Sequence, residues 1–144
     1  MIEVTGNLWT YPADVRVITT NGTVKANGEC VMGRGCALEA KRQQQGIALA
    51  LGRLIQQRGN HVHLLNNGKV ELYSFPVKHH WMQKADLALI ARSAEELLCE
   101  VETGPLVVVL PRPGCGNGGL KWSDVKPAIA PILDDRFHVI TFAR

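Results

Sequence analysis

The stretch that decides the fold is Leu106-Val-Val-Val-Leu110, which continues directly into Pro111-Arg-Pro-Gly-Cys-Gly-Asn-Gly-Gly-Leu120. The five apolar residues of the first part, three of them β-branched, predict a strand that is buried on both faces, as at the centre of a parallel sheet. The next ten residues contain four glycines and two prolines, which the interior of a helix or strand does not tolerate. An apolar-periodic segment follows Trp122, with Ser123 or Asp124 as its expected N-cap.

A strand, a glycine-rich loop and a helix start together present bare backbone N–H groups to an anion, most often a phosphate. A ligand can approach the main chain closely at the glycines, which have no Cβ: Gly114, Gly116, Gly118 and Gly119. A second loop of this kind, Met32-Gly33-Arg34-Gly35, leads into the helical sequence 36–44. A glycine turn without a ligand explains either loop alone, but two such loops favour an anion site.

Composition limits the class of protein. The 144 residues suit one domain, 1–144, with the apolar and charged fractions of a soluble globular protein. The net charge of +3 slightly favours anionic partners, and no lysine- or arginine-rich run indicates a polybasic nucleic-acid binder. The first residues resemble neither a signal peptide nor a membrane span, so we expect a cytoplasmic protein without a membrane partner.

The four cysteines are far apart in the sequence and have no zinc-site spacing, which predicts reduced thiols and no metal centre. An alternative is a thiol enzyme in which Cys115 is the nucleophile. That chemistry needs a neighbouring base, for which His79 and His80 are the candidates.

Alternation and helical periodicity predict a series of strands and helices along the chain. The expected strands are 1–5, 15–20, 61–65, 70–75, 106–110 and 137–142, and the expected helices are 36–44, 47–58, 85–101 and a short or kinked one at 124–133. Asn67-Gly68 predicts a type I′ hairpin turn. This order indicates an α/β fold, a three-layer α/β/α sandwich with a mixed central sheet of about six strands, whose ligands bind at the carboxyl ends of the strands.

Four motifs resemble those of the macrodomains, the ADP-ribose-binding fold. Within that family the chain is similar to the branch of terminal ADP-ribose glycohydrolases and DNA ADP-ribosyl glycohydrolase antitoxins. The motifs span nearly the whole chain: Thr5-Gly-Asn-Leu8, Val31-Met-Gly-Arg-Gly35, Ser74-Phe-Pro-Val-Lys-His-His-Trp81 and Pro111–Trp122. The stretch Asn21–Gly28, with Asn-Gly at both ends, is similar to members encoded by bacteriophages.

The resemblance implies a role for each motif, and no metal or cofactor. Asn7 and Leu8 take the adenosine, and Phe142 is a candidate for stacking on the adenine, unless it is an ordinary core aromatic. The two glycine loops hold the diphosphate through Met32, Gly33, Arg34, Gly35, Gly114, Cys115, Gly116, Asn117, Gly118 and Gly119. Lys78 attacks or polarises the anomeric carbon of the distal ribose, and His79 or His80 shuttles protons.

One position departs from part of the family. Some relatives carry a catalytic Asp where this chain has Gly118, although the antitoxin-like members share its Asn-Gly-Gly. Without that Asp, Asn21 or Asn27 is the candidate to orient a water at the distal ribose. The resemblance predicts a monomeric hydrolase that removes ADP-ribose from a nucleobase, an acidic side chain or an acetyl ester, on DNA or protein. The alternative functions are a non-catalytic ADP-ribose reader and an unrelated phosphate-binding enzyme.

Overall fold

Six strands form one sheet in the computed structural model, which describes residues 1–101, 103–104 and 106–142. The order across the sheet is β1-β6-β5-β2-β4-β3, and every neighbouring pair is parallel except β3 with β4. The central strands are the most apolar and the most buried, as a sheet covered on both faces requires. The strands are β1 (Ile2–Thr5), β2 (Val15–Asn21), β3 (His63–Asn67), β4 (Glu71–Lys78), β5 (Val108–Pro111) and β6 (Phe137–Thr141).

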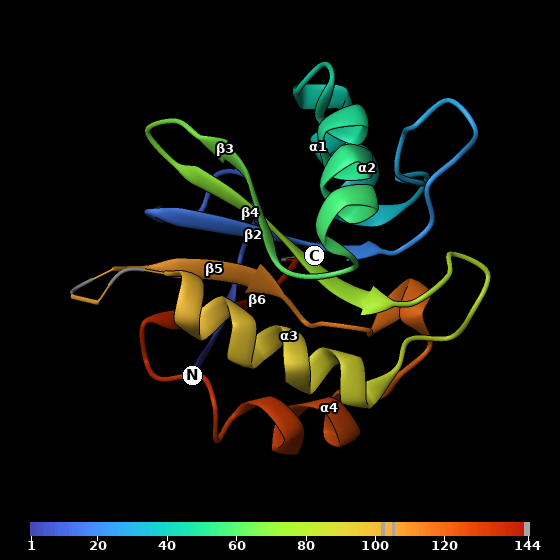
Figure 1. Ribbon diagram of the computed structural model, residues 1–144. Coiled ribbons are helices and arrows are strands. Elements are labelled where there is room, and N and C mark those ends of the chain that lie inside the picture. The colour runs from blue at the N-terminus through green and yellow to red at the C-terminus, as the bar shows by residue number, and fades with distance from the viewer. Residues whose placement is uncertain (102, 105, 143–144) are drawn as a thin grey trace.

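Two pairs of helices cover the two faces of the sheet (Figure 1). One face carries α1 (Gly35–Gln43) and α2 (Ile47–Arg58), and the other carries α3 (Leu87–Glu100) and α4 (Trp122–Ile129). The apolar stripe of α3 packs on the sheet through Ile90, Ala94 and Leu97, all fully buried. The structure confirms the predicted three layers and mixed sheet of six strands.

Each face has its own hydrophobic core. Phe75 and Phe137 lie in the core under α3 and α4, whereas Ile18 and Leu51 lie in the core under α1 and α2. Burying a side chain of this size stabilises the fold by about 1.5–3 kcal/mol. No helix in the described part of the chain is long and apolar enough to cross a membrane.

Several local expectations were wrong. The β3–β4 hairpin exists, but its turn is not type I′, because neither Asn67 nor Gly68 has a positive φ. The side chain of Asn66 instead accepts a hydrogen bond from Gly68 N at 2.9 Å, and the strand carries a bulge. At α4 the N-cap is Lys121, not Ser123 or Asp124, because the helix already begins at Trp122.

Element boundaries also shifted by a few residues. The central strand begins at Val108 rather than Leu106, and the last strand ends at Thr141, one residue before Phe142. The long helix begins at Leu87 because Asp86 caps it, accepting a hydrogen bond from Ala88 N at 2.9 Å. The short last helix ends at Ile129, two residues before Pro131, as its prolines predicted.

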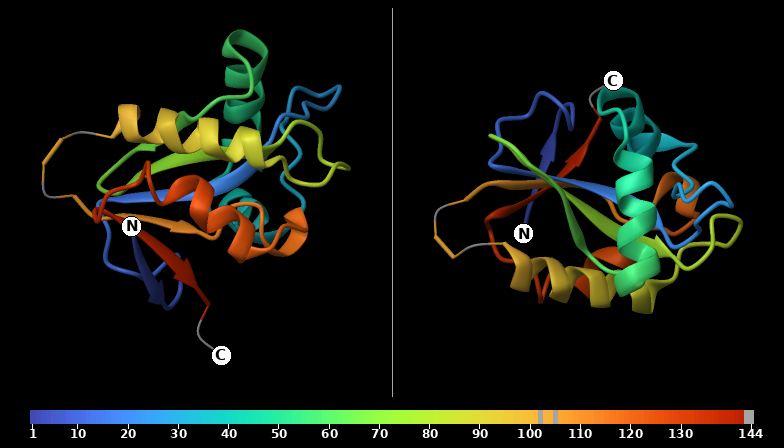
Figure 2. Two further views of the ribbon diagram at one scale, coloured as in Figure 1. Left: turned by 90° about the horizontal axis from the view of Figure 1, so that it is seen from below. Right: turned by 45° about the horizontal axis from the view of Figure 1, so that its top comes forward.

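Three adjacent parallel strands, β5, β2 and β4, end at the same edge of the sheet. The loops that leave them are residues 112–121, 22–34 and 79–86. On the other side of β5, strands β6 and β1 lie side by side and end in the same direction (Figure 2). Every motif of the sequence that resembles a ligand loop therefore follows a strand at this carboxyl edge.

Candidate functional site

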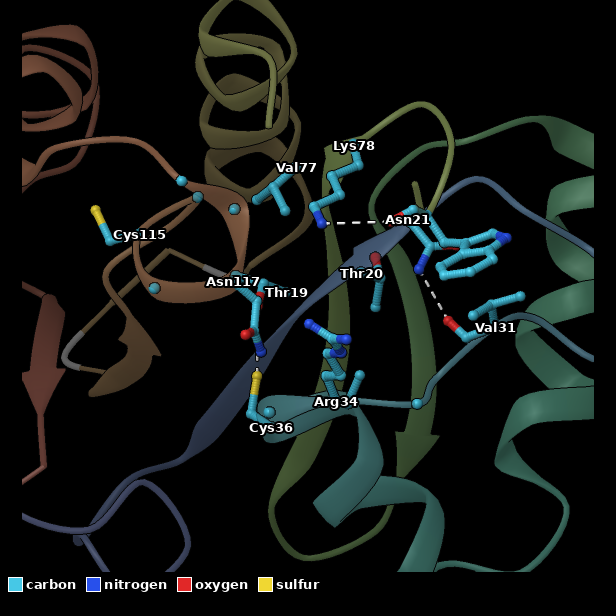
Figure 3. Close-up of a pocket in the computed structure, with 18 of the residues that line it drawn as sticks. Thr19, Thr20, Asn21, Val31, Arg34, Cys36, Val77, Lys78, Cys115 and Asn117 are labelled. Atoms are coloured by element: carbon cyan, nitrogen blue, oxygen red, sulfur yellow. Dashed lines mark hydrogen bonds between the residues drawn. The ribbon is translucent and has the colours of Figure 1, made fainter. Parts of the chain in front are cut away.

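A cavity of about 950 Å³ opens at the carboxyl ends of β5, β2 and β4. Its volume lies near the upper end of the range for small-molecule sites. Both glycine loops, the loop after Lys78 and the end of β2 line it. In Figure 3, Lys78 and Arg34 extend toward the same space from opposite sides.

The first glycine loop ends in the N-terminus of α1. Arg34 occupies the N-cap position with extended backbone, and its side chain makes no capping hydrogen bond. The N–H groups of the first turn are therefore not satisfied by a cap, and the first turn contains no acidic side chain. Gly33, Gly35 and Cys36 line the cavity here, so the positive end of the helix dipole faces an open space.

The second glycine loop is a tight turn that only glycine permits. Gly114, Gly116 and Gly119 have φ values of 75°, 75° and 78°, in the left-handed region. Hydrogen bonds from Gly119 N to Gly116 O and from Leu120 N to Gly114 O, both 3.0 Å, close the turn. Residues 116–118 between them line the cavity as a short 3₁₀ turn.

The two loops face each other across the cavity. A Cβ on Gly35, in the first loop, would lie 3.6 Å from Nδ2 of Asn117 in the second. Backbone from two loops is therefore close enough to contact one small anionic group from both sides.

The lining of the cavity is cationic. Of the described residues that line it, four carry positive side chains (Arg34, Lys78, Lys84 and Arg112), and none carries a carboxylate. Charges of one sign in a concave site attract an anionic ligand. The cavity is therefore electrostatically suited to a phosphate or diphosphate.

Arg112 is held in place from behind. Its guanidinium lies over the indole of Trp122, 5.0 Å from the ring centroid, and contacts Glu3 at 3.5 Å. Glu3 also accepts hydrogen bonds from Lys126 and Trp122 Nε1, which lower the pKa of its carboxyl group. The Arg112 guanidinium is thus anchored to β1 and α4, beside the carboxylate of Glu3.

Lys78 is the last residue of β4 and lies opposite Asn21, the last residue of β2. Its ammonium group donates a long hydrogen bond of 3.4 Å to the backbone oxygen of Trp81, and its own carbonyl accepts from Asn60 Nδ2 at 3.0 Å. The amide of Asn21 is fixed on both sides, since Nδ2 donates to Val31 O and Oδ1 accepts from Thr23 N. One N–H and one lone pair of that amide are not used by these two bonds.

Two of the predicted catalytic residues lie outside the cavity. Asn27 is exposed, and its side chain is bonded to Glu29 through both the carboxylate and the backbone N–H. His80 is also exposed, stacks beside Trp81 and accepts from Met82 N. His79 Nε2 is hydrogen-bonded to Asp86 Oδ2 at 2.8 Å, and His79 does not line the cavity.

The predicted adenosine residues also lie outside the cavity, at the ends of β1 and β6. Asn7 is exposed, and its Oδ1 accepts from Trp9 N at 2.8 Å, whereas the side chain of Leu8 is buried. Phe142 is 73% exposed, so it is not a core aromatic. A hydrogen bond of 2.8 Å from Gly6 N to Thr141 O joins the two segments.

The thiols do not favour the alternative of a thiol enzyme. Burial raises the pKa of the Cys115 thiol, and its sulfur lies 3.7 Å from Pro113 O. Burial likewise raises the pKa of Cys36, whose sulfur contacts Thr19 Oγ1 at 3.4 Å. All four cysteines are free thiols.

Sequence reasoning missed several residues that line the cavity. Lys84, Gln83 and Met82 follow the Lys78 motif, and Arg112 and Trp81 were quoted within motifs without a role. Lys84 was detectable as the first cation after the motif. Its stem lies along the second glycine loop, because a Cβ on Gly119 would be 3.5 Å from Lys84 Cγ.

Comparison with known proteins gives the same fold. No protein-family model matches the sequence. The macrodomain of Mycobacterium tuberculosis DarG superposes with a TM-score of 0.79 and 26% identity, over 98% of this chain and 97% of that one. A curated protein of Thermus aquaticus, named DNA ADP-ribosyl glycohydrolase, is 32% identical over 140 residues. The chain is a macrodomain.

The alignment with the curated relative covers most of this chain but only part of that protein. It covers 91% of this macrodomain but only 37% of the Thermus aquaticus protein. A third relative, Thermosipho africanus DarTG in complex with ADP-ribose, has a TM-score of 0.78 and 19% identity, over 96% of this chain and 40% of that one. At that identity the likeness shows the fold alone.

Proposed function

We propose that this macrodomain binds ADP-ribose along the carboxyl edge of its sheet and hydrolyses the bond between the distal ribose and its carrier. The observation that carries the proposal is that Lys78 and both glycine loops line one cavity. A binder of diphosphate alone needs the loops. A hydrolase also needs a reactive group, such as the amine of Lys78, beside the anomeric carbon.

The order of the strands supports a direction for the ligand. The adenosine residues follow β1 and β6, the glycine loops follow β5 and β2, and Lys78 ends β4. Adenosine, diphosphate and distal ribose would thus lie in sequence across five adjacent strands, a span of about 19 Å at ~4.8 Å per strand. The stacking partner for the adenine is then Phe142, which is exposed as that role requires.

The chemistry assigns the bond-making step to Lys78. In its neutral form the amine attacks the anomeric carbon while the bond to the carrier breaks and the carrier leaves with the electron pair and a proton. Water then hydrolyses the lysine–ribose adduct and regenerates the amine. Asn21 lies opposite Lys78 and is the candidate to orient that water through the second N–H of its amide, since its oxygen accepts from Thr23 N and from the Cys30 thiol.

For the carrier we propose a DNA base. The Thermus aquaticus relative bears the name of a DNA ADP-ribosyl glycohydrolase. On the Lys78 side of the cavity, Trp81 is 47% exposed and Met82 is 73% exposed. An exposed indole at this position offers a flat surface on which a nucleobase can stack.

The test combines binding with turnover. We expect micromolar binding of ADP-ribose by calorimetry, about −8 kcal/mol, and release of ADP-ribose from ADP-ribosylated DNA in preference to protein-linked or acetyl-linked substrates. Lys78→Ala should lose about 10²–10⁴-fold in kcat and keep its affinity. Lys69→Ala, in the exposed β3–β4 turn, is the matched control and should behave as the wild type.

Two results would contradict the proposal. Binding without turnover of any substrate would make the chain a reader, which the absence of a carboxylate among the described lining residues favours. No binding at millimolar ADP-ribose would show that the cavity is not an ADP-ribose site.

A further inference from the structure

The backbone of Trp81 lies between Lys78 and a residue of a different loop. Its N–H donates to Oγ1 of Thr23 at 3.0 Å, and its carbonyl accepts from Nζ of Lys78 at 3.4 Å. Figure 3 shows the second of these bonds beside Asn21. The Thr23 hydroxyl, 58 positions away in the sequence, therefore binds the peptide between His80 and Trp81, and the lysine binds the next peptide, between Trp81 and Met82.

Thr23 itself is firmly held. Its N–H donates to Asn21 Oδ1 at 3.0 Å, and its carbonyl accepts from Val31 N at 3.0 Å. Asn21 Nδ2 also donates to Val31 O at 2.9 Å, which closes the base of the loop. The threonine is thus fixed to the end of β2 and to the first glycine loop.

The rest of this loop is anchored on α2. Cys30 N donates a hydrogen bond to Ala48 O at 2.9 Å. The carbonyl oxygen of Gly28 lies only 1.9 Å from the position that a Cβ on Gly52 would occupy. Such a close approach is possible only because Gly52 has no side chain. The loop therefore presents Thr23 from a rigid base.

The segment that carries Trp81 has few supports of its own. Within residues 79–83, the hydrogen bonds described to other parts of the chain are His79 to Asp86, Trp81 to Thr23 and the long bond from Lys78 to Trp81. The bonds from Met82 N and Gln83 N both go to His80, inside the segment. Losing the Thr23 hydroxyl would therefore remove one of the few bonds to the rest of the chain that fix the orientation of the backbone at Trp81.

Lys78 depends on that orientation. A lysine side chain has many rotamers, and holding it in one of them requires a fixed partner for its ammonium group. We propose that Thr23 is a positioning residue for Lys78, acting through the backbone of Trp81. The proposal rests on the proposed function, since it concerns the step assigned to Lys78.

The test uses two substitutions that differ by one hydroxyl. Thr23→Val keeps the volume and removes the hydroxyl, whereas Thr23→Ser keeps the hydroxyl. We expect Thr23→Val to lose about tenfold in kcat, because a small misplacement of a reacting group is costly. Its KM and its affinity for ADP-ribose should stay within about twofold, and Thr23→Ser should recover the rate. Thr10→Val, at an exposed threonine outside the cavity, is the matched control.

Two further measurements do not depend on turnover. In Thr23→Val, hydrogen exchange of the Trp81 amide should become faster, since its acceptor is gone. The site-resolved rate at which an amine-reactive reagent modifies Lys78 should change, relative to Lys69 in the same sample. A merely structural role would lower the melting temperature and the ligand affinity together without a selective loss in kcat.

The outcomes separate the two proposals. If Lys78→Ala is inactive and Thr23→Val retains wild-type kcat, Trp81 exchange and Lys78 reactivity, the positioning role is overturned and the hydrolase stands. If the wild type hydrolyses no substrate, the proposed function fails. The exchange and modification rates then decide whether Thr23 orders Trp81 and Lys78.

Discussion

The second glycine loop allows a sharp test of how packing and backbone strain combine. Gly114 is buried with φ +75°, and a Cβ there would lie 2.6 Å from Ile90 Cδ1 and 3.1 Å from Ala85 Cβ. The left-handed backbone costs a non-glycine residue about 1–2 kcal/mol, and overpacking a full core costs about 1–3 kcal/mol. Gly114→Ala should therefore lower the free energy of unfolding by about 2–5 kcal/mol, a large part of what a domain has.

Gly116→Ala is the matched control for strain. Gly116 has the same φ, +75°, but a Cβ there meets no atom within 4 Å. It should lose about 1–2 kcal/mol, the strain cost alone. Urea denaturation of both variants measures the difference, which we expect to be about 1–3 kcal/mol.

A third variant tests whether the difference comes from Ile90. Ile90→Val removes the Cδ1 atom that a Cβ on Gly114 would meet at 2.6 Å. The double variant should then be less destabilised than the sum of the two single ones, by about 1 kcal/mol. Equal losses in Gly114→Ala and Gly116→Ala, together with simple additivity in the double variant, would refute the reasoning.

Two further predictions concern the segment between β4 and α3 and its contact with the second glycine loop. Gly118→Asp, which adds the carboxylate that some relatives carry, should lower the free energy of unfolding by about 1–3 kcal/mol, because a Cβ on Gly118 would lie 3.0 Å from Ala85 Cβ. Adding Ala85→Gly should recover most of that loss in a denaturation series, and a fully stable Gly118→Asp variant would contradict the packing argument. At Asp86, the hydrogen bond from His79 holds the pKa of the carboxyl below its usual 3.8. The ionised carboxylate therefore adds stability above the unfolded-state pKa, and this is lost as pH falls through the folded-state pKa. The stability difference between the wild type and Asp86→Asn should shrink as pH falls through the unfolded-state pKa of about 3.9 toward the lower folded-state pKa, and a constant difference would show that the charge contributes nothing.

Much of the fold follows from the sequence because its signals are local. The apolar run before Pro111 and the periodic stretch of α3 are buried where such patterns must be buried. The positions of both glycine loops also followed, because glycine clusters do not continue a strand or helix, and two of them placed before helices favour an anion site. These features alone predicted that Lys78 and both loops lie at the carboxyl edge of the sheet.

What the sequence did not predict depends on contacts between distant segments. Asp86 was not identified as the cap of α3, because the apolar pattern alone placed the helix start at Ala85. The hairpin turn did not follow its Asn-Gly pair, since Asn66 closes the turn through its own side chain. The bond from Trp81 N to Thr23 joins residues 58 positions apart, which no local pattern reveals.

The glycine at 118 and the loop carrying Thr23 are linked through one segment, residues 79–86. Ala85 N donates to Gly118 O at 2.9 Å, so the segment packs against the second glycine loop so closely that no Cβ fits at Gly118 without displacing Ala85. At its other end the same segment is tied to Thr23 through Trp81. A carboxylate at 118 is thus disfavoured by packing in this chain. The hydrolytic step proposed for it has to draw on amide and hydroxyl groups from the β2 side, where Asn21 and Thr23 lie.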